Sequence, residues 1–133
     1  MLSIDGLSMG REVARHGSVY VCPLDKPPQI GDVLLIQLGE SYVIHRMIAE
    51  TNETEKKIIT KGDHCVSADK PASYEEIMGL VKGLKKDDTL WKPWHWRRPL
   101  SYFIAIWSRL EAKFWGRFRY PFVIARKLRY ILR

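Results

Sequence analysis

Four side chains in this 133-residue sequence could together supply an alcohol that attacks a carbonyl group and the groups that activate it. Ser8 is followed 37 residues later by His45, and Asp63 and Asp69 come after both. A serine hydroxyl is a weak nucleophile until a neighbouring base accepts its proton, and an imidazole is the usual base. A carboxylate behind the imidazole fixes its tautomer and stabilises its charged form. Serine, histidine and one of the aspartates therefore predict a hydrolytic triad assembled from separate segments.

Glycines on both sides of Ser8 favour a sharp bend there. Gly6 and Gly10 can take backbone angles that other residues avoid, so the serine can sit on a turn with its hydroxyl outward. Backbone N–H groups around such a bend are simple donors to the oxyanion that forms during acyl transfer. The alternatives are an ordinary turn at Ser8 and, for His45, a strand histidine whose hydrogen bonds are satisfied within the fold.

Short apolar runs separated by turn residues predict the β-strands that must position these side chains. Residues 33–38 and 41–49 form a hairpin, because Gly39-Glu40 between them has the length of a two-residue loop, and His45 lies near the middle of its second strand. Further strands are expected at 17–22, 57–60 and 79–84, with one helical turn at 75–78 and a charged linker at 85–88. No alternation of strands and long helices is present, so the fold class is mainly β and antiparallel.

Charge is divided unevenly along the chain. Residues 1–90 hold 11 Lys and Arg against 14 Asp and Glu, which gives −3, whereas residues 91–133 hold 11 against Glu111 alone, which gives +10. The second part also contains all five tryptophans, and apolar residues recur there at helical spacing from Leu100 to Phe114. A second short helix is expected at 122–132. Such a basic, amphipathic tail favours an anionic membrane surface as its partner, while no recognition motif for nucleic acid accompanies it.

The two cysteines, Cys22 and Cys65, are too few for a disulfide framework and lack the clustered pattern of a zinc site. We expect two free thiols in a reducing compartment, no metal and no cofactor. Cys65 and His64 are expected to fill a loop without a role. The sequence also predicts no signal peptide and no bilayer-spanning segment, because no apolar run approaches about 20 residues.

Five short motifs, taken in order, resemble those of one family. They are Gly6-Leu7-Ser8-Met9, Gly17, Gly31-Asp32-Val33-Leu34, Val43-Ile44-His45-Arg46 and Gly79-Leu80-Val81-Lys82-Gly83. Over residues 5–84 the chain resembles the signal peptidase I/LexA-like serine peptidases. Most of that superfamily use lysine as the base. Histidine followed by arginine is similar to the endoplasmic-reticulum and spore-former types of signal peptidase. Those types also carry a Lys-Gly-Asp motif and a downstream aspartate, which Lys61-Gly62-Asp63 and Asp69 match here.

This resemblance implies a role for each candidate residue. Ser8 matches the nucleophile, His45 the base and Asp69 the orienting acid, with Asp63 as second choice for that role or for holding the loop. The implied fold is a small, coiled, barrel-like peptidase domain over residues 1–86, followed by the basic tail at 87–133. The implied activity is endoproteolysis of a precursor or leader peptide with small residues before the cut. Family members carry a membrane helix ahead of the serine, and here the tail is expected to replace it.

Two other function classes are open. One is a catalytically inactive or regulatory LexA-like module on the same fold, and the other is a basic membrane- or nucleic-acid-binding protein in which the β domain is a scaffold. The expected location is a prokaryotic membrane, with the protein peripheral or shallowly inserted through residues 91–133. A soluble cytoplasmic protein is the second choice.

Overall fold

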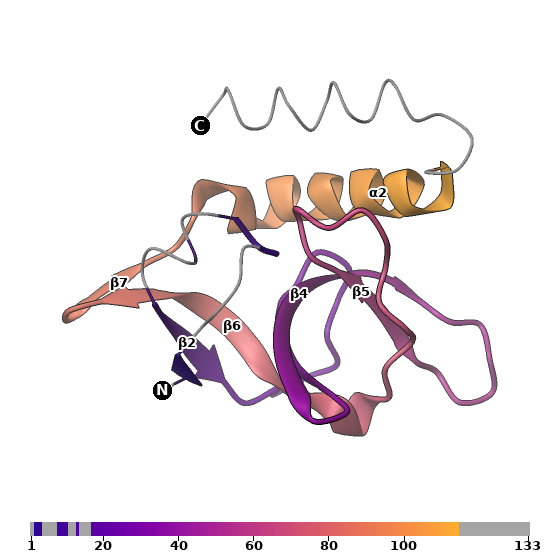
Figure 1. The fold of residues 1–133 in the computed structure, drawn as a ribbon, viewed down its shortest axis with the longest axis horizontal. Helices are drawn as coiled ribbons and strands as arrows, with labels where there is room; N and C mark the ends of the chain where they lie inside the picture. The colour runs from indigo at the N-terminus through magenta and orange to yellow at the C-terminus, as the bar shows by residue number, and fades with distance from the viewer. Residues whose placement is uncertain (1, 4–7, 11–12, 14–16, 115–133) are drawn as a thin grey trace.

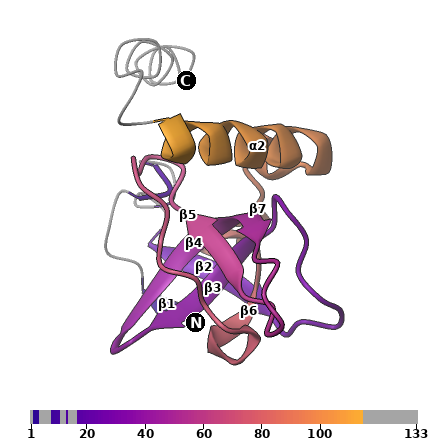
Figure 2. The same ribbon diagram turned by 90° about the vertical axis from the view of Figure 1, so that its right-hand side faces the viewer.

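The computed structural model describes residues 2–3, 8–10, 13 and 17–114, and over these residues the fold is mainly β. One antiparallel sheet and one long helix make up the described part (Figures 1 and 2). The strands are β1 (Leu2–Ser3), β2 (Ser18–Cys22), β3 (Val33–Leu38), β4 (Ser41–Glu50), β5 (Ile58–Lys61), β6 (Ile77–Lys86) and β7 (Thr89–Trp91). Six of them follow the order β1-β2-β6-β3-β4-β5, and β7 pairs with β6; this path is not closed among the described strands.

The predicted hairpin is confirmed as β3 and β4. Their register runs from Val33 opposite Arg46 to Leu38 opposite Ser41, which leaves a two-residue turn between the strands. Gly39 in that turn has a φ of +62°, a conformation that glycine adopts without steric cost. The other predicted strands appear as β2, β5 and β6. The helical turn predicted at 75–78 lies slightly earlier, as the 3-10 turn η1 (Tyr74–Glu76), and β6 already begins at Ile77.

The prediction of a charged linker at residues 85–88 is wrong. Those residues complete β6 and turn into β7, with Leu84 opposite Trp91 and Lys86 opposite Thr89. Asp87 takes a φ of +53°, and aspartate is one of the few non-glycine residues that tolerate the left-handed region. β6 and β7 therefore form a second hairpin where the composition of the sequence changes. The run of charged residues at the turn has the composition of a linker, which is why the hairpin was not predicted. The strand β1 was likewise not predicted.

Apolar side chains are buried on both faces of the sheet. Along β3, Val33 and Leu35 join one cluster while Leu34 and Ile36 join another, because successive side chains of a strand point to opposite faces. The first cluster also contains Met9 and Val13, which ties the segment around Ser8 to the sheet. Because both faces of β3 are buried, the strand is apolar at successive positions and does not alternate with polar residues.

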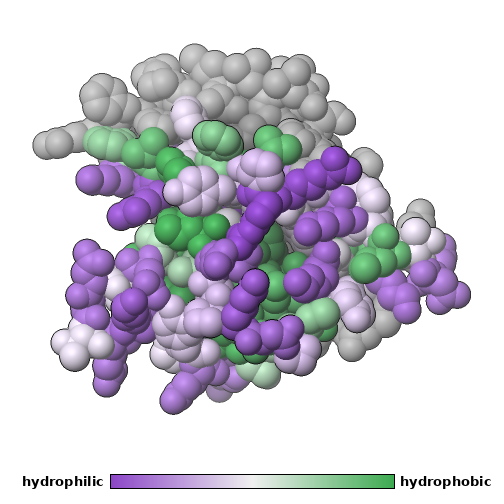
Figure 3. Space-filling view, turned by 180° about the vertical axis from the view of Figure 1, so that it is seen from behind, coloured by the Kyte–Doolittle hydropathy of each residue, from purple (hydrophilic) through white to green (hydrophobic). Residues whose placement is uncertain are grey.

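The helix predicted from the apolar spacing is α2 (Arg98–Phe114), and it lies across one end of the sheet (Figures 1 and 2). Its buried side chains are small or polar: Ser101, Ala105, Ser108 and Glu111. Six of its large apolar side chains are exposed instead, whereas Ile104 and Phe114 are half-buried; the exposed ones are Leu100, Tyr102, Phe103, Ile106, Trp107 and Leu110. Figure 3 shows green, apolar side chains in this helix layer at the surface. Within the described residues, no helix has the length and apolar character required to cross a bilayer.

Two parts of the sequence prediction lie outside the described residues. They are Gly6-Leu7, on the N-terminal side of Ser8, and the helix expected at 122–132. Gly10, on the other side of the expected bend, is described and has a φ of +104°, the left-handed region that favours glycine.

Candidate active site

The ring of His45 is held by Asp69. Nδ1 of His45 donates to Oδ2 of Asp69 across 2.5 Å. His45 lies in β4, whereas Asp69 lies in the loop after β5 and is fixed there by Thr60. The backbone N–H of Asp69 donates to the Thr60 carbonyl, and the Thr60 hydroxyl donates to Oδ2 of Asp69, both at 2.8 Å. The Asp69 carboxylate is therefore positioned by Thr60 of β5 as well as by the imidazole.

The surroundings of His45 favour its charged form. The side chain is almost fully buried, and burial alone would lower its pKa. Hydrogen bonds and charge interactions with Asp69 and Cys65 outweigh this effect and raise the pKa of His45 from 6.5 to about 9. A carboxylate that stabilises an imidazolium is what a general base requires of its orienting acid. With Nδ1 bound to Asp69, Nε2 is the nitrogen that can accept a proton from a nucleophile.

Ser8 is brought to the Nε2 side of His45 through Gly62. The backbone N–H of His64 donates to the Ser8 carbonyl at 2.8 Å. A Cβ atom added to Gly62 would lie 2.8 Å from that carbonyl oxygen and 3.0 Å from Nε2 of His45. Ser8 and the imidazole thus flank the same glycine of the Lys-Gly-Asp motif. Among the described residues, the ring is hydrogen-bonded to Asp69 through Nδ1, and no hydrogen bond joins it to the Ser8 hydroxyl.

Asp63, the second candidate acid, is engaged by Arg46. Nε and Nη2 of Arg46 donate to Oδ1 and Oδ2 of Asp63 at 2.8 and 2.7 Å, and both side chains are at most 3% exposed. Two parallel bonds of this kind fix the relative orientation of the two groups. The structure therefore pairs Asp69 with the imidazole and uses Asp63 to hold the loop against β4.

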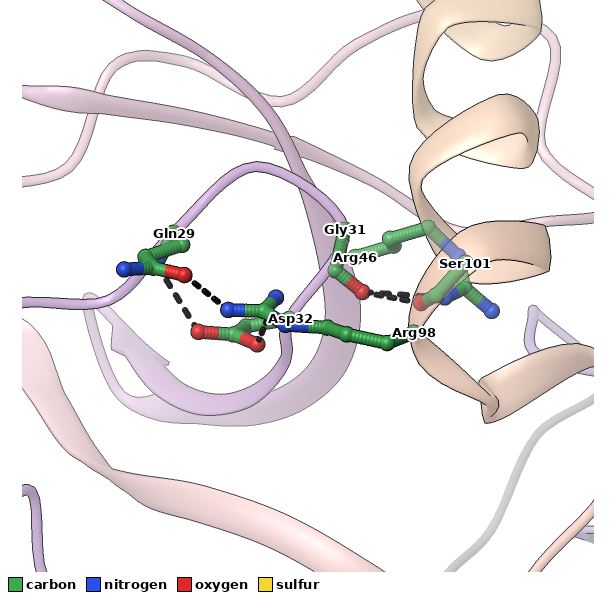
Figure 4. Close-up of polar contacts among 6 residues, drawn as sticks. All are labelled: Gln29, Gly31, Asp32, Arg46, Arg98 and Ser101. Carbon is green, nitrogen blue, oxygen red and sulfur yellow. Dashed lines mark hydrogen bonds and ion pairs between the residues drawn. The ribbon is translucent and has the colours of Figure 1, made fainter.

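The same arginine connects the site to α2 (Figure 4). Nη1 of Arg46 donates to the Gly31 carbonyl at 3.0 Å and to the hydroxyl of Ser101, which in turn donates to the Gly31 carbonyl. At the surface beside it, Arg98 pairs with Asp32 at 3.0 Å. The residue after the candidate base therefore anchors the first turns of the helix, which explains why that face of α2 carries small polar side chains.

Cys65 is the site residue that the sequence prediction missed. Its Sγ would lie 2.7 Å from a Cβ added to Gly62, a position that is 3.0 Å from Nε2 of His45, and its interaction with the ring helps to raise the pKa of His45. A single cysteine in a loop carries no spacing pattern, so only its position two residues after Asp63 could have indicated this place. Across the described residues, no cluster of three His, Cys, Asp or Glu side chains is arranged to hold a metal ion.

Comparison with known proteins adds no relative. The chain matches no family model, no curated protein and no solved structure. The resemblance to signal peptidases therefore depends on the motifs in the sequence itself.

Proposed function

We propose that this chain is a serine endopeptidase of the signal peptidase I/LexA-like type that cleaves a precursor or leader peptide. Ser8 is the nucleophile, His45 the general base and Asp69 the orienting acid. The observation that carries the proposal is the 2.5 Å bond from His45 Nδ1 to Asp69, with Ser8 adjoining the glycine that faces the other ring nitrogen. These three residues come from three separate segments of the chain, which is how peptidase triads are built on unrelated folds.

In the proposed reaction, Oγ of Ser8 forms a bond to the carbonyl carbon of the scissile peptide. Its proton passes to Nε2 of His45, and the imidazolium is stabilised by Asp69. The oxyanion is held by backbone N–H groups of the bend at Ser8. Collapse of the tetrahedral intermediate breaks the C–N bond, and His45 returns the proton to the leaving amine. Water then hydrolyses the acyl-enzyme by the same route. A side-chain rotation of Ser8 has to bring the hydroxyl to Nε2 when substrate binds.

An anionic membrane surface is part of the same proposal. What supports it is the face that α2 leaves exposed: Phe103 is 69% exposed and Trp107 is 41% exposed, and basic residues such as Arg109 and Lys113 are exposed on the same helix. Apolar and aromatic side chains insert at the headgroup boundary, and each basic residue near an anionic surface contributes about 1 kcal/mol. We also propose that the sheet coils in the barrel-like manner of this family and that the basic tail, expected from residue 87, begins only after β7, at residue 92.

Peptide cleavage tests the proposed activity. Candidate precursor peptides with small residues before the cut are incubated with the protein and anionic vesicles, and products are identified by mass spectrometry. Wild type is expected to cut after the small residue, and Ser8→Ala is expected to be inactive. Ser67→Ala is the matched control, because Ser67 is an exposed serine of the same site loop and is expected to leave cleavage unchanged. Equal cleavage by wild type and Ser8→Ala would contradict the assignment of the nucleophile.

A further inference from the structure

The Nε2 side of His45 is occupied by sulfur as well as by Ser8. The backbone N–H of Cys65 donates to the Gly62 carbonyl at 2.9 Å, which closes a β-turn over residues 62–65. That turn folds Cys65 back, so its Sγ and Nε2 of His45 lie within 2.7 and 3.0 Å of one point beside Gly62. The thiol of Cys65 and the segment that carries Ser8 therefore both lie on the Nε2 side of the imidazole.

A thiol beside an imidazole that is held by a carboxylate is an arrangement that activates sulfur. The imidazole accepts the thiol proton and the carboxylate stabilises the resulting charge, as it does for an alcohol. Cys65 is also partly exposed, so a small reagent can reach it. Structural cysteines are normally buried in apolar surroundings, where they are inert. The position of Cys65 fits a reactive thiol and not a packing residue.

We propose that Cys65 is a modification site for small disulfides, and that its modification blocks the use of His45 by Ser8. In the reaction, Sγ of Cys65 attacks one sulfur of the disulfide and forms a new S–S bond, while the disulfide's own S–S bond breaks. The second thiol leaves as a thiolate and takes the proton that His45 had accepted. Cys65 is oxidised and the small disulfide is reduced, and a thiol reductant reverses the exchange. The blocking effect rests on the proposed peptidase function, whereas the thiol reactivity does not.

The second cysteine provides an internal control. Cys22 is also a free, partly exposed thiol, but it lies in β2, which β6 and β3 separate from β4 in the sheet. Both thiols can be followed in one sample of wild-type protein, so the comparison does not depend on a variant that folds. If exposure alone governs reactivity, the two cysteines react at similar rates. If the imidazole matters, Cys65 reacts faster.

The experiment treats the full chain with oxidised glutathione and follows the adduct by peptide mass mapping. Glutathione is expected on Cys65 at least about 10-fold faster than on Cys22, and His45→Gln is expected to slow the reaction of Cys65 about 10-fold while leaving that of Cys22 unchanged. Equal rates at the two cysteines, or a Cys65 rate that His45→Gln does not change, would overturn the reactive-thiol assignment.

A second readout tests the blocking effect separately. Oxidised glutathione is expected to suppress the rate at which the wild type cleaves the peptide, and dithiothreitol is expected to restore that rate. The cleavage rate of Cys65→Ala is expected to respond to neither reagent. Adduct on Cys65 without loss of cleavage would refute the switch and leave the peptidase intact. Adduct on Cys65 in a protein that cleaves no peptide, with or without dithiothreitol, would refute the switch together with the proposed peptidase function.

Discussion

Nζ of Lys61 and Oε2 of Glu111 lie 3.0 Å apart, and both side chains are at most 2% exposed. The bond joins the end of β5 to the last turn of α2, so the Lys-Gly-Asp segment and the helix are connected through the protein interior. Together with the bond from Arg46 to Ser101, it attaches both ends of α2 to the strands that carry the candidate site. The helix is thereby part of the site's framework.

Removal of one partner of this pair leaves a buried charge without compensation. Glu111→Ala is expected to lower the free energy of unfolding by about 3–5 kcal/mol, measured by urea denaturation. The matched control is Lys56→Ala at the exposed pair with Glu50, whose nitrogen and oxygen lie 3.6 Å apart. That change is expected to cost about 0–1 kcal/mol. A loss of less than about 1 kcal/mol in Glu111→Ala would show that the buried pair does not hold the helix.

Substitution of Asp69 and substitution of Asp63 are expected to affect different properties, catalysis in one case and stability in the other. Asp69→Asn removes the charge beside His45 and is expected to lower kcat by about 10²–10⁴-fold, with a smaller effect on the free energy of unfolding. Asp63→Asn breaks the buried pair with Arg46 and is expected to lower the free energy of unfolding by about 3–5 kcal/mol. Steady-state kinetics and urea denaturation of both variants separate the two effects. A kcat that falls in Asp63→Asn but not in Asp69→Asn would contradict this assignment and make Asp63 the orienting acid.

The raised pKa of His45 sets the dependence on pH. Because its pKa is about 9 in the fold and 6.5 without these partners, the folded state favours the protonated ring. The resulting stabilisation is complete below pH 6.5 and is lost as pH rises from 6.5 through about 9. The base must be neutral to accept a proton, so kcat/KM is expected to rise over the same interval while Tm falls. A kcat/KM that is already constant above pH 6.5 would show that the bond with Asp69 does not outweigh the lowering of the His45 pKa by burial.

Under the proposed membrane association, the exposed face of α2 is the predicted lipid-binding surface. Phe103→Ser and Trp107→Ser are each expected to weaken binding to vesicles of phosphatidylcholine and phosphatidylserine about 10-fold, because each removes a large apolar group from the interface. Tyr42→Ser is the matched control, since Tyr42 is 54% exposed but lies in β4 away from the helix. Vesicle sedimentation measures all three. Equal effects of the three changes would indicate that α2 is not the binding face.

The fold was largely predictable because its strands carry local signals. Alternating and continuous apolar runs, a two-residue turn with glycine and the spacing after Leu100 gave the β3–β4 hairpin and the extent of α2. Apolar spacing alone did not indicate which face of the helix is buried; an outward apolar face was expected only from the basic charge and the tryptophans of the tail, which favoured a membrane surface. Apolar spacing normally marks the buried side, but the strands beneath α2 present Arg46 and Lys61, whose partners are Ser101 and Glu111.

The candidate site could be predicted only in part, because some of its contacts depend on tertiary structure. His45 and the choice between Asp63 and Asp69 followed from the motifs, and the structure separates the two acids by their partners. The place of Cys65 depends on the turn over residues 62–65, a tertiary detail that no spacing rule encodes. The second hairpin was concealed because its turn, Asp87-Asp88, has the composition of a linker.

Covalent labelling of Ser8 tests the central claim most directly. An alkyl fluorophosphonate reacts with a serine hydroxyl only when a base activates it. Mass mapping of the labelled protein is expected to locate the adduct on Ser8, and the adduct is expected to be absent in Ser8→Ala and strongly reduced in His45→Gln. An unlabelled Ser8 in the wild type, or equal labelling in His45→Gln, would contradict a serine activated by this imidazole.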